Sequence, residues 1–169
     1  METSDGFPPI ERPDARILVL GSLPGRKSIA EQQYYAHPQN VFWPIMREIF
    51  GIEGEYHHRC IQLRARQVAL WDVLRSSERP GSLDSDIRMK SAQPNDFGVF
   101  FEQHPAIELV AFNGRKAEQM FGRFVDSAIT PRTVEQIGLP STSPAYAAMS
   151  FSGKLSAWRN AFLPLLEKE

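Results

Sequence analysis

Short apolar segments alternate with segments of helical periodicity along this chain, and this alternation restricts the fold more than any other feature of the sequence. Four apolar runs have the length of strands, and they cover residues 16–20, 67–74, 107–112 and 133–139. All four have the pattern of buried strands, and the last shows alternating apolar residues. Because strands separated by helices form parallel sheets, the sequence predicts an α/β fold around a mainly parallel, four-stranded sheet.

Three further segments each have one apolar face, as expected of helices that pack on such a sheet. Their apolar positions are Phe42, Trp43, Ile45, Met46, Ile49 and Phe50, then Ala117, Met120 and Phe121, then Leu155, Trp158, Ala161, Phe162 and Leu165. Gly51 stands where the first helix would end, and Ser150 or Ser152 offers a cap for the last. Ligands of parallel sheets bind beyond the carboxyl ends of the strands, so the loops there are candidate functional segments.

The length of the chain suits one domain and is short for two. We expect residues 16–169 of the 169 residues to form a single domain, preceded by an N-terminal extension over residues 1–15. The first residues are acidic and contain prolines, and no stretch approaches the roughly 20 apolar residues that span a bilayer. We therefore expect a cytoplasmic protein that does not enter a membrane.

Cysteine content and net charge narrow the chemistry. Cys60 is the only cysteine, so an internal disulfide is impossible, and a thiolate site for zinc or an iron–sulfur cluster lacks its other ligands. We expect neither a metal nor another cofactor. The formal net charge of −1 argues against binding of nucleic acid through a broad basic face. Any contact with DNA must therefore be local.

The first candidate loop follows the first predicted strand and covers residues 21–25, with the sequence Gly-Ser-Leu-Pro-Gly. Two glycines and a proline allow a sharp turn and a close approach of a ligand to the backbone. The spacing is neither that of a Walker loop nor that of a dinucleotide-binding fingerprint. On its own, the loop is also consistent with a plain structural turn.

The second candidate loop covers residues 33–43 and places aromatic and carboxamide side chains just before a helix. Tyr34 and Tyr35 offer a surface on which a base can stack, and Asn40 offers a donor and an acceptor without a charge. The alternative interpretation is that the tyrosines cover the core and that Asn40 caps the helix.

The third candidate loop follows the last predicted strand and places three hydroxyl side chains, at positions 141–143, between Pro140 and Pro144. Short hydroxyl side chains and backbone amides can bind phosphate oxygens without bulk, which suits a chain of little net charge. The alternative is an ordinary turn that leads into the last helix.

Together these loops closely resemble those of the hypoxanthine-DNA glycosylases, also called DNA-deoxyinosine glycosylases, a branch of the uracil-DNA glycosylase superfamily. The likeness runs from about Arg16 to Trp158, and it implies a three-layer α/β/α sandwich and a metal-free DNA glycosylase. The matching segments are residues 21–25 with 33–43 for the family's first motif, 139–145 for its second motif, and 69–74, 81–85 and 112–114 between them. The chain departs from the family pattern at Tyr146, where asparagine is usual, and at Gln39, where a basic residue is common.

The resemblance implies roles for individual residues. Mismatch-specific relatives carry an asparagine in the first turn, where this chain has Ser22 or Leu23, so Asn40 is the best remaining carboxamide to orient the attacking water. Ser22 completes the expected catalytic pair. The expected base-binding residues are Gly21, Leu23, Tyr35, His37 and Asp72, and the expected DNA-binding residues are Ser141, Thr142, Ser143, Pro144, Ala145 and Tyr146.

The implied reaction is the flipping of a deaminated base, hypoxanthine or uracil, out of DNA and the hydrolysis of its glycosidic bond. Cleavage leaves an oxocarbenium-like sugar and an anionic base, so stabilisation of charge matters more than a strong base. Lys27 is the lysine that could form a Schiff base, but it lies in a polar loop, so we expect a monofunctional enzyme without lyase chemistry. We also expect the enzyme to act on DNA as a monomer. The rival hypothesis is a non-catalytic nucleotide- or nucleic-acid-binding α/β module, because the same loops can hold a ligand without reacting.

Overall fold

Four parallel strands form the central sheet of the computed structural model, which describes residues 3–167. Their order in the sheet is β3-β2-β6-β7, and the strands are β2 (Ile17–Gly21), β3 (Val68–Asp72), β6 (Leu109–Asn113) and β7 (Glu135–Leu139). All three pairings are parallel, and Leu20 of β2 lies beside Trp71 on one side and Phe112 on the other. The predicted four-stranded parallel sheet is confirmed, and its carboxyl ends meet at one edge.

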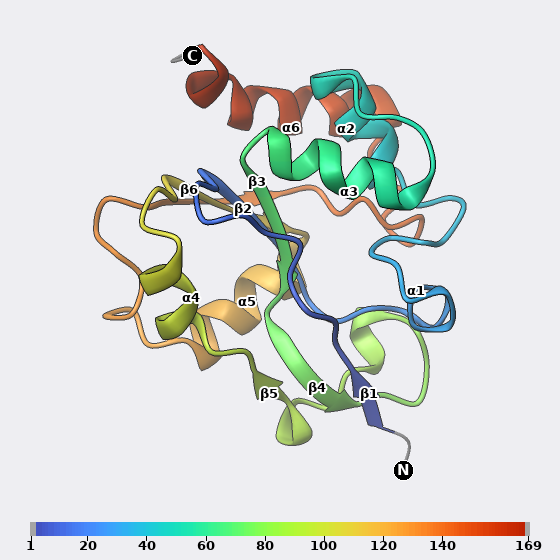
Figure 1. Cartoon of the computed structure of the whole chain (residues 1–169). Coiled ribbons are helices and arrows are strands. Elements are labelled where there is room, and N and C mark those ends of the chain that lie inside the picture. Colours follow the sequence, from blue (N-terminus) through green and yellow to red (C-terminus); the bar gives the residue numbers. More distant parts are fainter. Residues whose placement is uncertain (1–2, 168–169) are drawn as a thin grey trace.

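Helices cover both faces of this sheet (Figure 1). One face carries α2 (Phe42–Phe50), α3 (Tyr56–Ala65) and α6 (Phe151–Leu166), and the other carries α4 (Phe97–Gln103) and α5 (Arg115–Phe124). The short helix α1 (Arg26–Glu31) follows β2. Because side chains alternate along a strand, Ile17 and Val19 of β2 join one buried core, while Leu18 and Leu20 join the other. The implied three-layer α/β/α sandwich is confirmed.

The predicted strand over residues 67–74 is two strands in the structure. β3 ends at Asp72, and β4 (Leu74–Glu78) begins two residues later. β4 pairs antiparallel with β1 (Thr3–Asp5) and β5 (Gln93–Pro94), which gives a second, three-stranded sheet in the order β1-β4-β5. The sequence did not reveal this sheet because β4 reads Leu-Arg-Ser-Ser-Glu and carries no apolar run. Two short 3-10 helices, Asp84–Asp86 and Met89–Ser91, lie between β4 and β5.

The prediction that residues 133–139 form a buried strand was wrong as to burial. β7 is an edge strand, since its only neighbour in the sheet is β6. Its residues 135–138 are exposed, and Leu139 alone is buried. An edge strand packs on fewer neighbours, so alternating apolar residues there need not face a core.

The predicted helices begin and end close to where their capping residues indicated. Gly51 ends α2 with φ of 73°, a left-handed backbone conformation that glycine adopts without strain. Ser150, one of the two candidate caps, begins α6, and its Oγ accepts a hydrogen bond of 3.1 Å from the Gly153 N–H. The segment around Met120 lies within α5.

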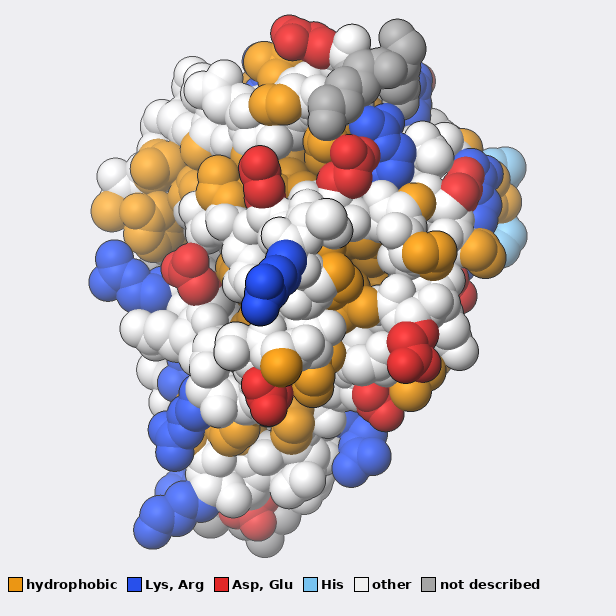
Figure 2. Space-filling view, turned by 90° about the vertical axis from the view of Figure 1, so that its left-hand side faces the viewer, with side chains coloured by type: hydrophobic (Ala, Val, Ile, Leu, Met, Phe, Trp, Pro, Cys, Tyr) orange, Lys and Arg blue, Asp and Glu red, His pale blue; other side chains and the backbone are white. Residues whose placement is uncertain are grey.

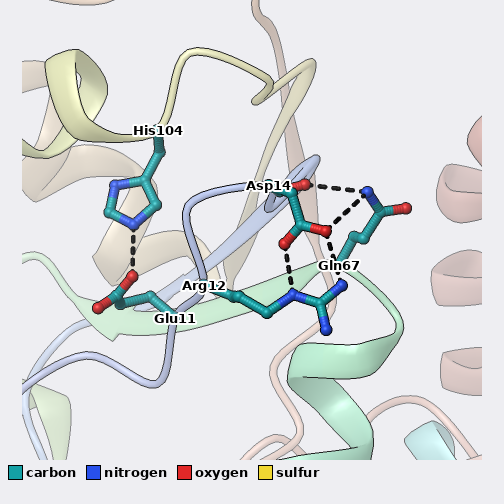
Figure 3. A network of polar contacts seen from close by, with 5 residues as sticks. All are labelled: Glu11, Arg12, Asp14, Gln67 and His104. Atoms are coloured by element: carbon teal, nitrogen blue, oxygen red, sulfur yellow. Dashed lines mark hydrogen bonds and ion pairs between the residues drawn. The ribbon is translucent and has the colours of Figure 1, made fainter.

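The described part of the expected N-terminal extension, residues 3–15, packs against the sheet. Besides the pairing of β1 with β4, Ile10 forms an isolated bridge with Leu70 of β3. Figure 3 shows the side chains that fasten the following segment: Glu11 binds His104, and Asp14 binds Arg12 and Gln67. The buried His104 ring also donates from Nδ1 to the Phe100 carbonyl oxygen at 2.7 Å. Residues 1–2 of the expected extension and residues 168–169 of the expected domain lie outside the described residues.

Charged side chains of both signs share the surface on the side of the molecule away from α1. In Figure 2, acidic side chains are spread across the centre of this face, while lysine and arginine side chains lie mainly toward its edges. This distribution agrees with the formal net charge of −1. Within residues 3–167, no helix is long and apolar enough to cross a membrane.

We predict that Glu11→Ala destabilises the protein more than Arg12→Ala. The Glu11 Oε2 to His104 Nε2 contact measures 2.7 Å, and the His104 side chain is only 3% exposed. Loss of the partner of a buried polar group costs about 1–3 kcal/mol. Arg12 pairs with Asp14 in solvent, where water and salt screen the attraction and such a pair contributes little to stability. Chemical denaturation measures the free energy of unfolding of both variants. Equal decreases would show that the contact between Glu11 and His104 does not stabilise this segment more than the surface pair does.

Candidate active site

A cavity of about 690 Å³ opens at the carboxyl ends of the parallel strands. Every residue predicted to act in catalysis or to bind a base lines it, and so do residues 141–145 of the third loop. Tyr146 does not line the cavity, and 39% of this residue is exposed. A volume of this size lies within the range of about 300–1,000 Å³ that is usual for small-molecule and cofactor sites.

The innermost part of the cavity is built around Gly21, the last residue of β2. A Cβ at this position would lie 2.6 Å from Asp72 Oδ1 and 2.8 Å from the Tyr35 hydroxyl oxygen. Both separations are shorter than ordinary contacts of a methyl group, so Gly21 allows the phenol and the carboxyl group to meet at the end of the strand. Asp72 is 4% exposed and ends β3, the neighbour of β2. The structure thus brings together Gly21, Tyr35 and Asp72, which are far apart in the sequence.

The two adjacent tyrosines of the second loop have different surroundings. Tyr34 is 4% exposed, its hydroxyl donates to the Pro8 carbonyl at 2.9 Å, and its own carbonyl accepts from the Trp43 indole N–H. Burial, with a contribution from the Asp72 carboxylate, raises the pKa of the Tyr34 phenol above its usual range. Tyr35 is only half-buried, and its ring packs on Phe42 with centroids 4.5 Å apart. Both tyrosines line the cavity, but the core-covering interpretation fits Tyr34 better, because more of Tyr35 is exposed.

Asn40 lies both next to the start of α2 and on the wall of the cavity. Its Oδ1 accepts a hydrogen bond of 2.9 Å from the Phe42 N–H, at the start of α2. The residue also lines the cavity. The side-chain oxygen therefore stabilises the start of the helix, while the residue stands where it can reach a ligand; its catalytic role stays a prediction.

Buried hydrogen bonds join the second and third loops to the sheet. Asn113, the last residue of β6, donates from Nδ2 to Thr142 Oγ1 and accepts at Oδ1 from the Thr142 N–H, both at 2.9 Å. The Thr142 carbonyl in turn accepts from the Val41 N–H at 3.0 Å. Thr142 is 1% exposed. Its hydroxyl is thus buried and engaged within the protein. The half-buried Ser141 and Ser143 accept from the Ser143 and Ala145 N–H groups at 3.1 and 3.2 Å, which leaves their hydroxyl hydrogens as candidates for contact with phosphate.

Lys154, in the first turn of α6, supports the third loop and was missed in the sequence. It is 5% exposed, its Nζ donates to the Ser143 carbonyl at 3.3 Å, and it lies 5.2 Å from the centroid of the Tyr146 ring. Burial lowers the pKa of the lysine from its usual value. The helical spacing did contain a clue, because Lys154 stands four residues before Trp158 and therefore on the buried face of the helix.

Arg79 is the second residue that the sequence did not single out. It is 2% exposed, and its guanidinium donates to the carbonyl oxygens of Leu23 and Pro24 in the first loop. No pattern in the sequence marks Arg79, because it follows a polar strand and precedes a turn.

The remaining candidates lie toward the opening of the cavity. His37 is exposed, and its Nδ1 accepts from the Gln39 N–H at 3.1 Å. Lys27 pairs with Glu31 at 2.8 Å on the surface of α1. Neither contact excludes a role in binding, and the base-binding role of His37 stays a prediction.

Comparison with known proteins identifies the family. The model of the family described as "Uracil DNA glycosylase superfamily" matches residues 8–167. The chain therefore belongs to the uracil-DNA glycosylase superfamily.

Its relatives include two archaeal proteins named "Hypoxanthine DNA glycosylase". The protein of Methanosarcina acetivorans is 34% identical over 160 residues, which cover 93% of this chain and 96% of the relative. The protein of Methanosarcina barkeri is 38% identical over 115 residues, which cover 66% of this chain and 72% of the relative. A solution NMR structure from M. acetivorans, described as a candidate uracil DNA glycosylase, superposes with a TM-score of 0.80 at 34% identity and covers 95% of this chain and 97% of that one.

We predict that Gly21→Ala destabilises the protein because the new methyl group meets Asp72 and Tyr35. Overpacking of this kind costs about 1–3 kcal/mol. Gly122→Ala is the matched control, since Gly122 lies in α5 and a Cβ there meets nothing within 4 Å. The free energy of unfolding of the control should rise by about 0.5–1 kcal/mol, because alanine is a better helix former than glycine. A Gly21→Ala protein as stable as the parent would show that the phenol and the carboxyl group shift without cost.

Proposed function

We propose that this protein is a monofunctional DNA glycosylase that flips a deaminated base, hypoxanthine or uracil, into the cavity and hydrolyses its glycosidic bond. The observation that carries the proposal is the gathering of Asn40, Ser22, Tyr35 and Asp72 around one cavity whose rim is the hydroxyl-bearing loop 141–145. Membership of the superfamily and the names of the two archaeal relatives support the same reaction. We place this activity in the cytoplasm and assign it to a monomer.

Entry of the base requires the third loop to hold the DNA backbone. A base stacked in a duplex does not expose its glycosidic bond, so the nucleotide must leave the stack, and weakly paired deaminated bases do so most readily. Ser141 and Ser143 line the cavity, where their hydroxyl hydrogens can donate to phosphate oxygens. Lys154 adds a cation behind this loop, which suits a local contact in a protein of little net charge.

Inside the cavity, the residues around Gly21 suit a planar, uncharged base with ring N–H groups. Tyr35 offers a ring on which the base can stack, and the Asp72 carboxyl group can accept from a ring N–H. Ser22, 6% exposed and next to Gly21, lies beside the same site. Hypoxanthine and uracil both carry such N–H groups next to a carbonyl, so these residues admit either base.

Hydrolysis needs a water placed next to the sugar and support for the developing charges. Asn40 is the neutral side chain in position to orient that water, and the backbone amides of the first loop can bind the anionic base as it leaves. Lys27 lies on the surface with Glu31 as its partner, so we assign it no covalent step.

The proposal is tested by incubating purified protein with duplexes and single strands that carry hypoxanthine, uracil, xanthine or thymine opposite each base. We expect free base and an intact strand with an abasic site, which breaks only on treatment with alkali. Borohydride should trap no covalent complex. Binding of such DNA without formation of abasic sites would instead favour the non-catalytic nucleic-acid-binding module.

We predict that Asn40→Ala lowers the single-turnover rate by about 100-fold or more, the effect expected for loss of one preorganised polar group in the transition state. DNA binding should remain, because the interaction is made mainly during bond cleavage. Asn40→Asp keeps an oxygen that can accept from the Phe42 N–H, so it should preserve the stability of the helix start. A lower cleavage rate in this variant would then reflect catalysis and not helix capping.

Ser150→Ala provides the control for capping alone. Ser150 caps α6 and does not line the cavity, so its loss should cost about 0.5–2 kcal/mol of stability without a change in the rate of the folded enzyme. If Asn40→Ala behaves in the same way, Asn40 is a cap and not a catalytic residue.

We predict that Tyr35→Ala weakens capture of the damaged base by about 1–3 kcal/mol, the value of a base–aromatic stack. Tyr35→Phe keeps the ring and should have a mild effect. Rates measured over a series of enzyme concentrations give the affinity of each variant. Equal losses of folding stability in both variants, with unchanged capture by the folded molecules, would assign Tyr35 to the core.

A further inference from the structure

We infer that the segment 79–86 is a fourth substrate-contacting loop, in which Leu83 packs against the deoxyribose of the flipped nucleotide. The inference rests on the proposed function and adds to it a residue that determines substrate capture.

Leu83 lies at the rim of the cavity with much of its surface in water. Ser82 and Leu83 both line the cavity, and Leu83 is 52% exposed. A leucine in such a position gains from any apolar ligand surface that covers it, because water is then released from both surfaces.

The base of the loop is fastened to the first loop of the cavity. The buried Arg79 guanidinium donates to the carbonyl oxygens of Leu23 and Pro24. In return, Arg26 donates from Nη2 to the Pro80 carbonyl at 2.5 Å and from its backbone N–H to Ser82 Oγ at 3.2 Å. These hydrogen bonds join the segment to the first loop from both sides.

The tip of the loop is closed by Asp86. Its Oδ2 accepts from the Leu83 N–H at 3.2 Å, and its own N–H donates to the Leu83 carbonyl at 2.9 Å. A Cβ at Gly81 would collide with the Asp86 carboxyl group, so the glycine permits this closure. Leu83 is thus held in position before DNA arrives, which reduces the entropy lost on binding.

The chemistry of the side chain selects the part of the nucleotide that it contacts. Leucine has no polar atom and leaves a phosphate without a partner, whereas the carbon atoms of a deoxyribose at the mouth of the cavity form an apolar surface. The phosphates would instead bind the hydroxyl-bearing loop 141–145, which lines the same cavity. The two loops thus divide the nucleotide between them by polarity.

The test compares Leu83→Ala with Ile61→Ala. Ile61 is a matched control, since it is 48% exposed, lies on α3 and does not line the cavity. Single-turnover cleavage of a hypoxanthine-containing duplex is measured over a series of enzyme concentrations. We expect Leu83→Ala to raise the half-saturating concentration by about three- to tenfold, as partial burial of a leucine implies. The maximal rate should stay within about twofold, because the contact is made before bond cleavage.

Two additional variants make the outcome decisive. Leu83→Met, which keeps an apolar side chain of similar size, should restore near-normal capture, and Leu83→Asp should impair it further because a carboxylate meets the phosphates. Leu83→Ala and Ile61→Ala with the same half-saturating concentration would overturn the inference. So would a lower melting temperature of Leu83→Ala alone, since it would mark Leu83 as a packing residue.

Failure of the proposed function gives a different result. If the parent protein releases no base from any duplex, the glycosylase proposal fails, and the same variants are then compared by binding to a duplex that carries a stable abasic-site analogue. Weaker binding of Leu83→Ala than of Ile61→Ala would still support contact of this loop with the sugar, and equal binding would overturn it.

Discussion

At the carboxyl end of β2, the backbone of Gly21 leaves no room for a side chain, and the site depends on this close packing. Asp72 from the neighbouring strand and Tyr35 from the second loop approach the glycine to within the reach of a single methyl group. Parallel strands make the meeting possible, because they bring the ends of β2 and β3 side by side. A carboxyl group and a phenol therefore lie beside the backbone of one glycine at the end of the strand.

Buried polar side chains fix the loops around this point. Asn113 and Thr142 exchange two hydrogen bonds between β6 and the third loop, and Arg79 binds two carbonyl oxygens of the first loop. Lys154 binds the third loop from α6. Buried polar groups require partners, so each of these contacts restricts the backbone of a loop that faces the ligand.

Prediction from the sequence succeeded where the pattern was local. We predicted the parallel sheet from the apolar runs of β2 and β6, whose residues are buried on both faces and are therefore mostly apolar. We predicted α2 from its single apolar face. The pattern failed for β4, whose polar residues pair with β1 and β5, and for β7, which is exposed at the edge of the sheet. Those two strands are defined by their partners, which a local pattern does not contain.

The sequence by itself determined the class of the fold, the loops that carry the chemistry and the family resemblance, since each of these depends on residues that are close along the chain. Only the tertiary structure decided the surroundings of individual residues: that Tyr34 is more deeply buried than Tyr35, that the Thr142 hydroxyl is engaged by Asn113, and that Arg79 and Lys154 lie buried behind the loops. The physical reason is that burial and hydrogen-bond partners arise from contacts between distant segments. The residue type of a tyrosine or a threonine does not reveal whether its hydroxyl group contacts a ligand or a neighbouring segment of the protein.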